Sequence, residues 1–181
     1  MEKIDLIEGC KEAKPNAQRQ LLERYSGLLF NVALRYSKDR SEAKDILQES
    51  WINIFKGILK YKHEGRLEGW MSRVVINVAL RKKQTFHART AIYDGAFYED
   101  VSERPEAIDQ LQYDDLLRIV NQLPDGCREV FKMAAIDGLK HKEIGKLLGI
   151  EESSSRAHLT RAKKKLRDIL AQLEKVETYG E

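Results

Sequence analysis

The chain has 181 residues, of which 34% are charged and 42% hydrophobic, and its formal net charge is +3. This length allows one ordinary domain or two small helical ones, and two distant cysteines, Cys10 and Cys127, exclude a disulfide framework or a cysteine-rich zinc site. No segment approaches the roughly 20 uninterrupted apolar residues of a membrane span, and the first residues lack the apolar core of a signal peptide. We therefore expect a cytoplasmic protein with no membrane insertion.

The distribution of charge is more informative than its sum. Basic residues concentrate at 81–89 and 156–167, whereas acidic residues dominate between 94 and 115. This segregation predicts two basic surfaces joined by an acidic segment.

In the first half, apolar residues recur at steps of three and four over 21–36, 43–59 and 70–79, which is typical of amphipathic helices. Ser41 is suitably placed to cap the second of these helices, and the third ends in Arg81, Lys82 and Lys83. The first half is therefore predicted to form a helical bundle.

The second half begins with another helical pattern from Leu111 to Leu123. Pro124 is expected to start the next helix at its tolerated first turn, and Gly138 to break it. Strand alternation, internal repeats and glycine-rich phosphate loops are absent from the sequence. We predict an all-α fold with two small helical domains, at residues 1–86 and 109–176, joined by an acidic flexible linker at 87–108.

The segment 143–166 has the spacing of a helix-turn-helix. Gly145 would permit close approach of the two helices, and Gly149 would adopt the left-handed turn conformation. In the second helix, one predicted packing face contains Ser155, Leu159, Ala162, Leu166 and Leu170. The other face is basic, which suits nucleic-acid phosphates, although a merely solvated basic helix is the alternative.

Three consecutive serines occupy the start of that second helix. Glu152 or Ser153 could cap it, and Ser153 and Ser154 could touch a phosphate. Ser155 takes a position that normally carries an apolar residue, where its hydroxyl could bond back to a carbonyl one turn earlier. The serines are thus compatible with a recognition helix.

One face of the helix predicted at 43–59 carries Asp45, Gln48, Glu49 and Ile52, opposite the stripe that contains Trp51 and Phe55. This mixed face suits a helical protein partner, but the pattern alone favours an ordinary charged surface. A carboxylate metal site is disfavoured because no Glu-x-x-His pair occurs. We predict no catalytic residue, metal ligand or cofactor.

The third helix and the loop before it combine an aromatic side chain, an amide and several cations. Stacking together with phosphate neutralisation is how single-stranded bases are held. Composition alone favours Trp70 as a core residue. The candidate residues are His63, Arg66, Trp70, Arg73, Asn77, Arg81, Lys82 and Lys83.

These patterns resemble the extracytoplasmic-function (ECF) group of sigma-70 family transcription initiation subunits. YSGLLFNVALRYSKDRSEAKDILQESWINIF and GWMSRVVINVALRKK resemble sigma region two, and LPDGCREVFKMAAIDGLKHKEIGKLLGIEESSSRAHLTRAKKKL resembles sigma region four. The resemblance covers nearly the whole chain, with both regions in the expected order.

For the first half, the resemblance implies that Asp45, Gln48 and Glu49 bind the clamp helices of the largest RNA polymerase subunit, and Ile52 shares their face. It also implies that the loop around His63 and the third helix face the melted minus-ten strand. There a flipped base would be read by loop backbone and by Asn77.

For the second half, the resemblance implies contacts with the minus-thirty-five element. Arg156, His158, Thr160 and Arg161 would lie in the major groove, with Lys163 and Lys164 near the backbone. Departures from the family pattern are Ser153 and Ser154, where a glycine and a threonine are usual, and His158, where arginine or glutamine is commoner.

The predicted function is a non-enzymatic, alternative sigma factor that binds core RNA polymerase, through its clamp helices and flap, and promoter DNA. An anti-sigma factor or another recruiting or regulatory protein is a further expected partner. The acidic linker would run along the polymerase, where its charge could mimic nucleic acid. Two alternatives remain, a helix-turn-helix regulator that never joins polymerase and a metal-dependent hydrolase using Asp45 and Glu49.

Overall fold

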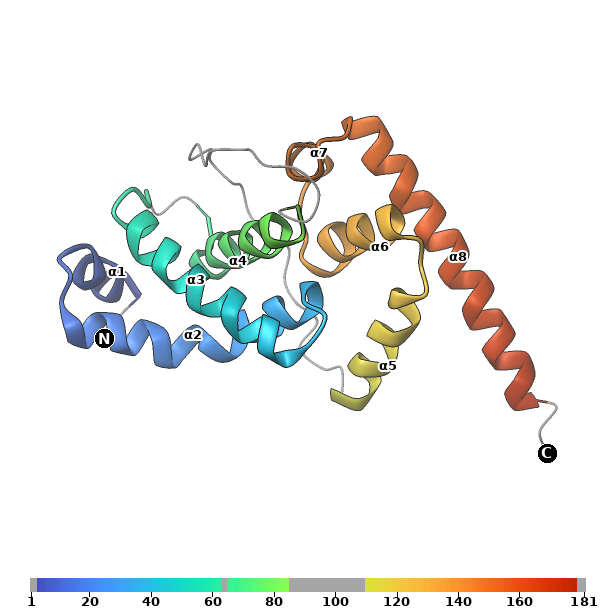
Figure 1. The fold of residues 1–181 in the computed structure, drawn as a ribbon, viewed down its shortest axis with the longest axis horizontal. Helices are drawn as coiled ribbons and strands as arrows, with labels where there is room; N and C mark the ends of the chain where they lie inside the picture. The colour runs from blue at the N-terminus through green and yellow to red at the C-terminus, as the bar shows by residue number, and fades with distance from the viewer. Residues whose placement is uncertain (1–2, 63–64, 85–109, 179–181) are drawn as a thin grey trace. The chain divides into compact units, whose positions relative to one another are not determined.

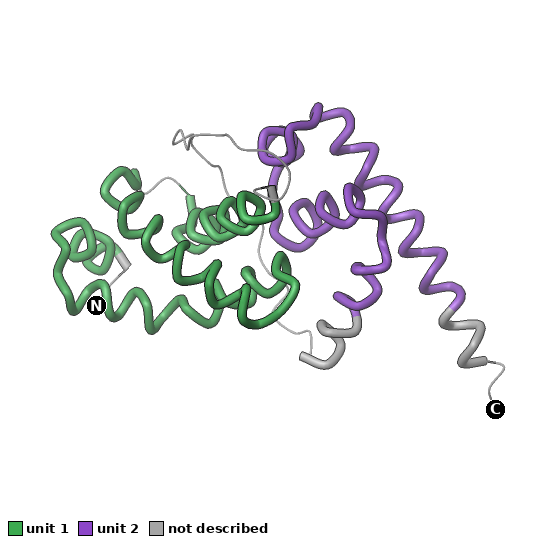
Figure 2. Tube along the Cα trace, in the orientation of Figure 1, with its two compact units in different colours: residues 1–100 green, residues 101–181 purple. Residues whose placement is uncertain are grey.

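The computed structural model describes residues 3–62, 65–84 and 110–178 (Figure 1). The chain divides into two compact units, residues 1–100 and 101–181 (Figure 2). All regular structure in the described ranges is helical, which confirms the all-α prediction. The predicted acidic linker, 87–108, lies outside the described residues.

The described residues of the first unit form four helices, α1 (Lys3–Lys11), α2 (Pro15–Tyr36), α3 (Arg40–Ile58) and α4 (Leu67–Gln84). Helices α2, α3 and α4 pack against one another, and α1 lies against α2 and α3. Fully buried apolar side chains from all four elements form the core, including Leu6, Leu21, Leu29, Ile46, Ile54, Met71 and Ile76. Helix α1 was not predicted, because a nine-residue helix provides too few turns for a periodic pattern.

Helix α3 is capped by Asp39, not by Ser41 as predicted. The Asp39 carboxylate accepts a hydrogen bond from the Glu42 backbone N–H over 2.8 Å, and the Glu42 carboxylate accepts one from the Lys38 N–H over 2.7 Å. Glu42 lies three residues after Asp39, where its carboxylate can accept a hydrogen bond from the backbone before the helix. The residue three after Ser41 is Lys44, whose side chain cannot accept such a bond. The helix therefore begins at Arg40.

The second unit contains α5 (Gln110–Asn121), α6 (Asp125–Phe131), a π-helical turn η1 (Lys132–Ile136), α7 (His141–Leu148) and α8 (Glu152–Thr178). Helix α8 packs against both α6 and α7. The core of the second unit includes a cluster of buried residues, Val120, Leu123, Cys127, Ala162 and Leu166, and the fully buried Val130, Met133 and Ile144.

The predicted breaks in the second unit are close to the observed ones. Pro124 precedes α6 by one residue and so occupies its N-cap, and Gly138 adopts a φ of 69° after η1. Among the helices of the described ranges, none has the length and hydropathy needed to cross a lipid bilayer.

Candidate functional site

A tight turn joins α7 to α8. Gly149 ends α7 in the left-handed conformation, with a φ of 67°, and a Cβ at Gly145 would lie 2.7 Å from the Ile150 carbonyl oxygen. That oxygen is backbone, so it cannot move aside as a side chain would. Both glycine predictions are confirmed, and the turn sets how α8 leaves α7.

Ser155 has no exposed surface, and its hydroxyl lies 2.9 Å from Nδ1 of His141, the first residue of α7. The predicted bond back to a carbonyl one turn earlier is therefore wrong. A hydrogen bond to a side chain of the other helix satisfies the buried hydroxyl and also joins α8 to the start of α7. Helix α8 begins at Glu152, so both Glu152 and Ser153 lie inside its first turn. Neither is therefore the N-cap that the sequence predicted, because the N-cap precedes the helix.

Burial lowers the pKa of His141, because it disfavours the charged imidazolium. The positive charge of Arg156 lowers this pKa further, Glu152 raises it, and Lys163 lowers it. The imidazole is therefore held mainly neutral, in which form its nitrogens can accept one hydrogen bond and donate another.

The packing face of α8 differs from the prediction at its C-terminal end. Ser155, Ala162 and Leu166 are buried, but Leu170 is 43% exposed and Ile169 is partly buried instead. Because 3.6 residues make a turn, the predicted set drifts around the helix, and the packed side follows Ile169.

His158 turns toward α6 and not outward. Its Nδ1 lies 3.6 Å from Sγ of Cys127, and a Cβ at Gly126 would lie 3.0 Å from its Cε1. His158 is four residues before the buried Ala162, so it lies on the packed side of the helix. His158 is half-buried there, and its contact with the major groove stays a prediction.

The remaining basic face of α8 is exposed as predicted. Arg156 forms an ion pair with Glu152, and the Thr160 hydroxyl donates to the Arg156 carbonyl over 3.1 Å. Ser154 is half-buried. The exposed members of the predicted set are Ser153, Arg156, Thr160, Arg161, Lys163 and Lys164.

The outward face of α3 carries the four residues that the sequence grouped together. Asp45 and Gln48 are exposed, Glu49 is half-buried, and Ile52 is 52% exposed. The rings of Trp51 and Phe55 on the same helix stack with centroids 5.7 Å apart. The α3 face thus combines an exposed apolar side chain with carboxylates and an amide.

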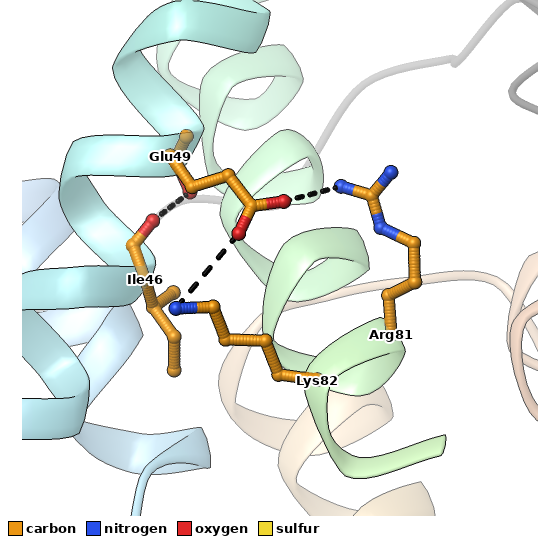
Figure 3. Close-up of polar contacts among 5 residues, drawn as sticks. Ile46, Glu49, Arg81 and Lys82 are labelled. Atoms are coloured by element: carbon orange, nitrogen blue, oxygen red, sulfur yellow. Dashed lines mark hydrogen bonds and ion pairs between the residues drawn. The ribbon is translucent and has the colours of Figure 1, made fainter. Parts of the chain in front are cut away.

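Glu49 connects α3 to the basic end of α4 (Figure 3). Arg81 Nη2 donates to Glu49 Oε1 over 3.0 Å, and Lys82 Nζ lies 3.8 Å from Glu49 Oε2. Sequence reasoning placed these residues on two separate surfaces and did not join them. Opposite charges on neighbouring helices were the available signal, but the spacing in sequence alone does not orient two helices.

Trp70 lies at the start of α4, between α3 and the preceding loop. Its ring centroid is 5.2 Å from that of Tyr61, and a Cβ at Gly57 would lie 3.0 Å from its Cζ2. The Tyr61 hydroxyl donates to the Gly65 carbonyl over 3.0 Å. Trp70 is thus partly buried and packed.

The other candidate residues of this surface differ in exposure. Arg66, Arg81 and Lys83 are exposed, and Asn77 and Lys82 are half-buried. Arg73 is only 4% exposed, so its predicted contact with a nucleic-acid strand is not available in this conformation. His63 lies outside the described residues.

Within the described ranges, no group of three histidine, cysteine, aspartate or glutamate side chains is arranged to hold a metal ion. Asp45 and Glu49 are therefore not joined there by further ligands of the kind that a metal-dependent hydrolase requires.

Comparison with known families matches both halves of the chain. Sigma-70 region 2 matches residues 21–89, and sigma-70 region 4 matches residues 113–166. The first match contains most of α2 and all of α3 and α4, and the second contains most of α5, all of α6, η1 and α7, and the first part of α8.

Curated relatives carry related names. The chain is 29% identical over 157 residues to the ECF RNA polymerase sigma factor SigE of Mycolicibacterium smegmatis, covering 84% of this chain and 61% of that protein. It is 25% identical over 171 residues to the RNA polymerase sigma factor CarQ of Myxococcus xanthus, covering 93% of this chain and 97% of that protein. The chain thus spans less than two thirds of SigE but nearly all of CarQ.

Two solved structures share the fold. CnrH, in complex with the cytosolic domain of CnrY, matches with a TM-score of 0.56 at 18% identity, covering 92% of this chain and 96% of that one. The sigma factor RpoE of Bartonella quintana, in complex with the anti-sigma factor NepR, matches with a TM-score of 0.55 at 19% identity, covering 84% and 96%. With both sigma regions present in order on one all-helical chain, the protein belongs to the ECF group of the sigma-70 family.

Proposed function

We propose that this chain is an alternative sigma factor, which binds core RNA polymerase and directs promoter recognition, DNA melting and transcription initiation. The observation that carries the proposal is the presence of sigma-70 regions 2 and 4 on one chain. A helix-turn-helix regulator that never joins polymerase is not favoured, because it would leave the match of residues 21–89 to region 2 without a role.

The polymerase-binding surface is assigned to the outward face of α3. Asp45, Gln48, Glu49 and Ile52 would contact the clamp helices of the largest subunit. Their mixture of carboxylates, an amide and an exposed isoleucine supports a helical protein partner. Charged groups at such a surface contribute mainly to specificity and association rate.

The minus-ten surface is assigned to α4 and the loop before it. Trp70 and Asn77 would meet unstacked bases, while Arg66, Arg81, Lys82 and Lys83 neutralise phosphates. His63 remains a prediction for the same loop. We assign Arg73 a supporting role inside the unit, because its burial leaves too little surface for a DNA contact.

The minus-thirty-five surface is assigned to the first half of α8. Arg156, Thr160 and Arg161 would read base edges, since arginine can make two hydrogen bonds to guanine. Lys163 and Lys164 would neutralise phosphates, and the hydroxyls of Ser153 and Ser154 at the helix start would donate hydrogen bonds to phosphate oxygens. His158 helps to hold α8 against α6.

The proposal includes the predicted organisation into residues 1–86, an acidic linker at 87–108 and residues 109–176. It also includes a non-enzymatic role in the cytoplasm and regulation by an anti-sigma factor or another protein partner. Support for such a partner comes from the relatives, since RpoE of Bartonella quintana was solved with an anti-sigma factor. The polymerase flap is the expected contact of the second unit.

Reconstitution of the chain with core RNA polymerase, followed by sequencing of transcript starts, tests this function. A shared pair of elements upstream of the starts is the expected result. Asp45→Arg combined with Gln48→Ala should abolish association with the core enzyme. Intact association in that double variant would refute the assignment of the α3 face.

A further inference from the structure

Glu49 belongs to the α3 face that the proposed function assigns to polymerase, yet its carboxylate is directed at α4 (Figure 3). It accepts a hydrogen bond from Arg81 over 3.0 Å and lies 3.8 Å from the Lys82 ammonium. Asp45, one turn earlier on the same face, makes no ion pair with a described residue of α4. Glu49 is thus the acidic residue through which the two surfaces meet.

Arg81 and Lys82 are the cations that the proposed function assigns to promoter phosphates. A phosphate that approaches them also approaches the Glu49 carboxylate, and the two anions repel each other. Full use of both cations by DNA therefore requires the carboxylate to leave or to be neutralised by another group. Polymerase can provide that group, since a partner complementary to Asp45 and Glu49 presents cations or hydrogen-bond donors.

We propose that Glu49 couples polymerase binding to DNA binding in this sigma factor. In the free chain its carboxylate holds Arg81 and Lys82, and engagement of Glu49 by polymerase releases both cations for promoter phosphates. This inference rests on the proposed function. Coupling of two binding events is reciprocal, so anything that frees Glu49 from α4 also favours polymerase.

The exposure of the three side chains limits the size of the effect. The exposed fractions are 50% for Arg81, 41% for Glu49 and 33% for Lys82, so solvent screens the ion pairs considerably. Changes in affinity of about 1.5- to 5-fold are expected from pairs of this kind. Glu49 would therefore tune the basal affinity for DNA without blocking it completely.

Glu49→Gln tests the release of the cations, with the full-length free chain and a fluorescent single-stranded DNA of mixed sequence. We expect about 1.5- to 5-fold tighter binding at low salt. The slope of log affinity against log salt should steepen by about 0.7 for each additional phosphate contact. An ion pair with a purely structural role would not change that slope.

Asp45→Asn is the matched control, because it removes one negative charge from the same face of α3 without contact to α4. It should leave the salt slope unchanged and alter affinity only through net charge. Thermal unfolding of each variant verifies that both are folded. Equal slopes and affinities for the two variants would overturn the inference.

Arg81→Gln tests the reciprocal direction, by titration of the labelled chain with core RNA polymerase. With Glu49 no longer held by Arg81, association should tighten by about two- to fivefold. Weaker or equal association contradicts the coupling. If the unaltered chain does not associate with core polymerase, the proposed function fails as well. If the unaltered chain associates but neither Glu49→Gln nor Arg81→Gln shows the expected tighter binding, the coupling alone is refuted.

Discussion

The two units place their binding residues by different means. In the first unit, α2, α3 and α4 are 22, 19 and 18 residues long and pack along their length. In the second, α6 and α7 have only 7 and 8 residues, and the position of α8 depends on the turn that follows α7. The outward faces of long helices therefore carry the first surface, whereas a backbone contact at a turn orients the second.

This difference predicts different weak points. A long-helix bundle loses stability when apolar volume is removed from its centre, because neighbouring side chains collapse only partly into the space. A helix-turn-helix loses its geometry when an atom is added between backbones that already touch. A large-to-small substitution in the core should therefore mainly destabilise the first unit, and a small-to-large substitution at the turn should mainly disturb the second.

The largest effect is expected from Leu29→Ala in α2. Leu29 has no exposed surface, and its truncation should cost about 2–5 kcal/mol of unfolding free energy through lost burial and a residual cavity. Urea unfolding followed by tryptophan fluorescence measures it, because Trp51 and Trp70 both lie in this unit. Leu59→Ala, at a leucine that is 62% exposed, is the control and should have little effect. Similar losses of unfolding free energy in the two variants would contradict the view that buried apolar volume stabilises this unit.

Gly145→Ala should be the strongest small-to-large change in the second unit. Its Cβ would lie 2.7 Å from the Ile150 carbonyl oxygen, so the turn must shift, at a cost of about 1–3 kcal/mol. Gly27→Ala adds the same methyl group to α2, where no atom lies within 4 Å, and should stabilise by about 0.5–1 kcal/mol. Hydrogen exchange resolved along the chain measures both, and protection of α7 that is unchanged in Gly145→Ala would argue against the tight turn.

Two substitutions on α8 should separate base reading from phosphate binding. Arg156→Ala should weaken binding to the mapped upstream element by about tenfold and relax the preference for its bases, because a bidentate base contact is lost. Lys163→Ala should weaken binding to all sequences alike and lower the salt slope by about 1. Binding of the polymerase complex to matched and mismatched promoter fragments measures these effects; uniform weakening by Arg156→Ala would remove its assigned role.

Ser155→Ala should destabilise the second unit modestly, by about 1 kcal/mol, because it removes a buried hydroxyl that is hydrogen-bonded to His141. Ser155→Val adds a second test, since valine restores apolar volume but leaves His141 without this partner. Hydrogen exchange in α7 should report the loss for both variants. A valine variant as protected as the parent chain would show that packing, and not the hydrogen bond, holds the two helices.

The smallest predicted effect is a pH dependence of the same contact. Because burial lowers the folded-state pKa of His141 below its usual 6.5, the unfolded chain binds a proton more readily than the folded one. Stability is therefore fully present above about pH 6.5 and is lost as the pH falls toward the lowered pKa. His141→Asn should flatten this dependence in α7 exchange between pH 7.5 and 5.5; an unchanged dependence would assign it to other groups.

Much of the architecture follows directly from the sequence. The 3.6-residue repeat of apolar side chains predicts α2, α3, α4 and α8, and the charge pattern predicts a basic face on α8. Gly145 and Gly149 predict the turn, because few other residues tolerate close backbone approach or a positive φ. These features are local, so a short stretch of sequence contains all the information they need.

The tertiary structure alone decided which side chains from distant positions meet. Glu49 and Arg81 are 32 residues apart and lie on different helices, and His141 and Ser155 are 14 residues apart across the turn. Periodicity assigns a residue to a face of its own helix, but the packing of one helix on another determines which partner that face contacts. For the same reason the sequence did not show that His158 lies against Cys127 of α6 or that Arg73 is buried.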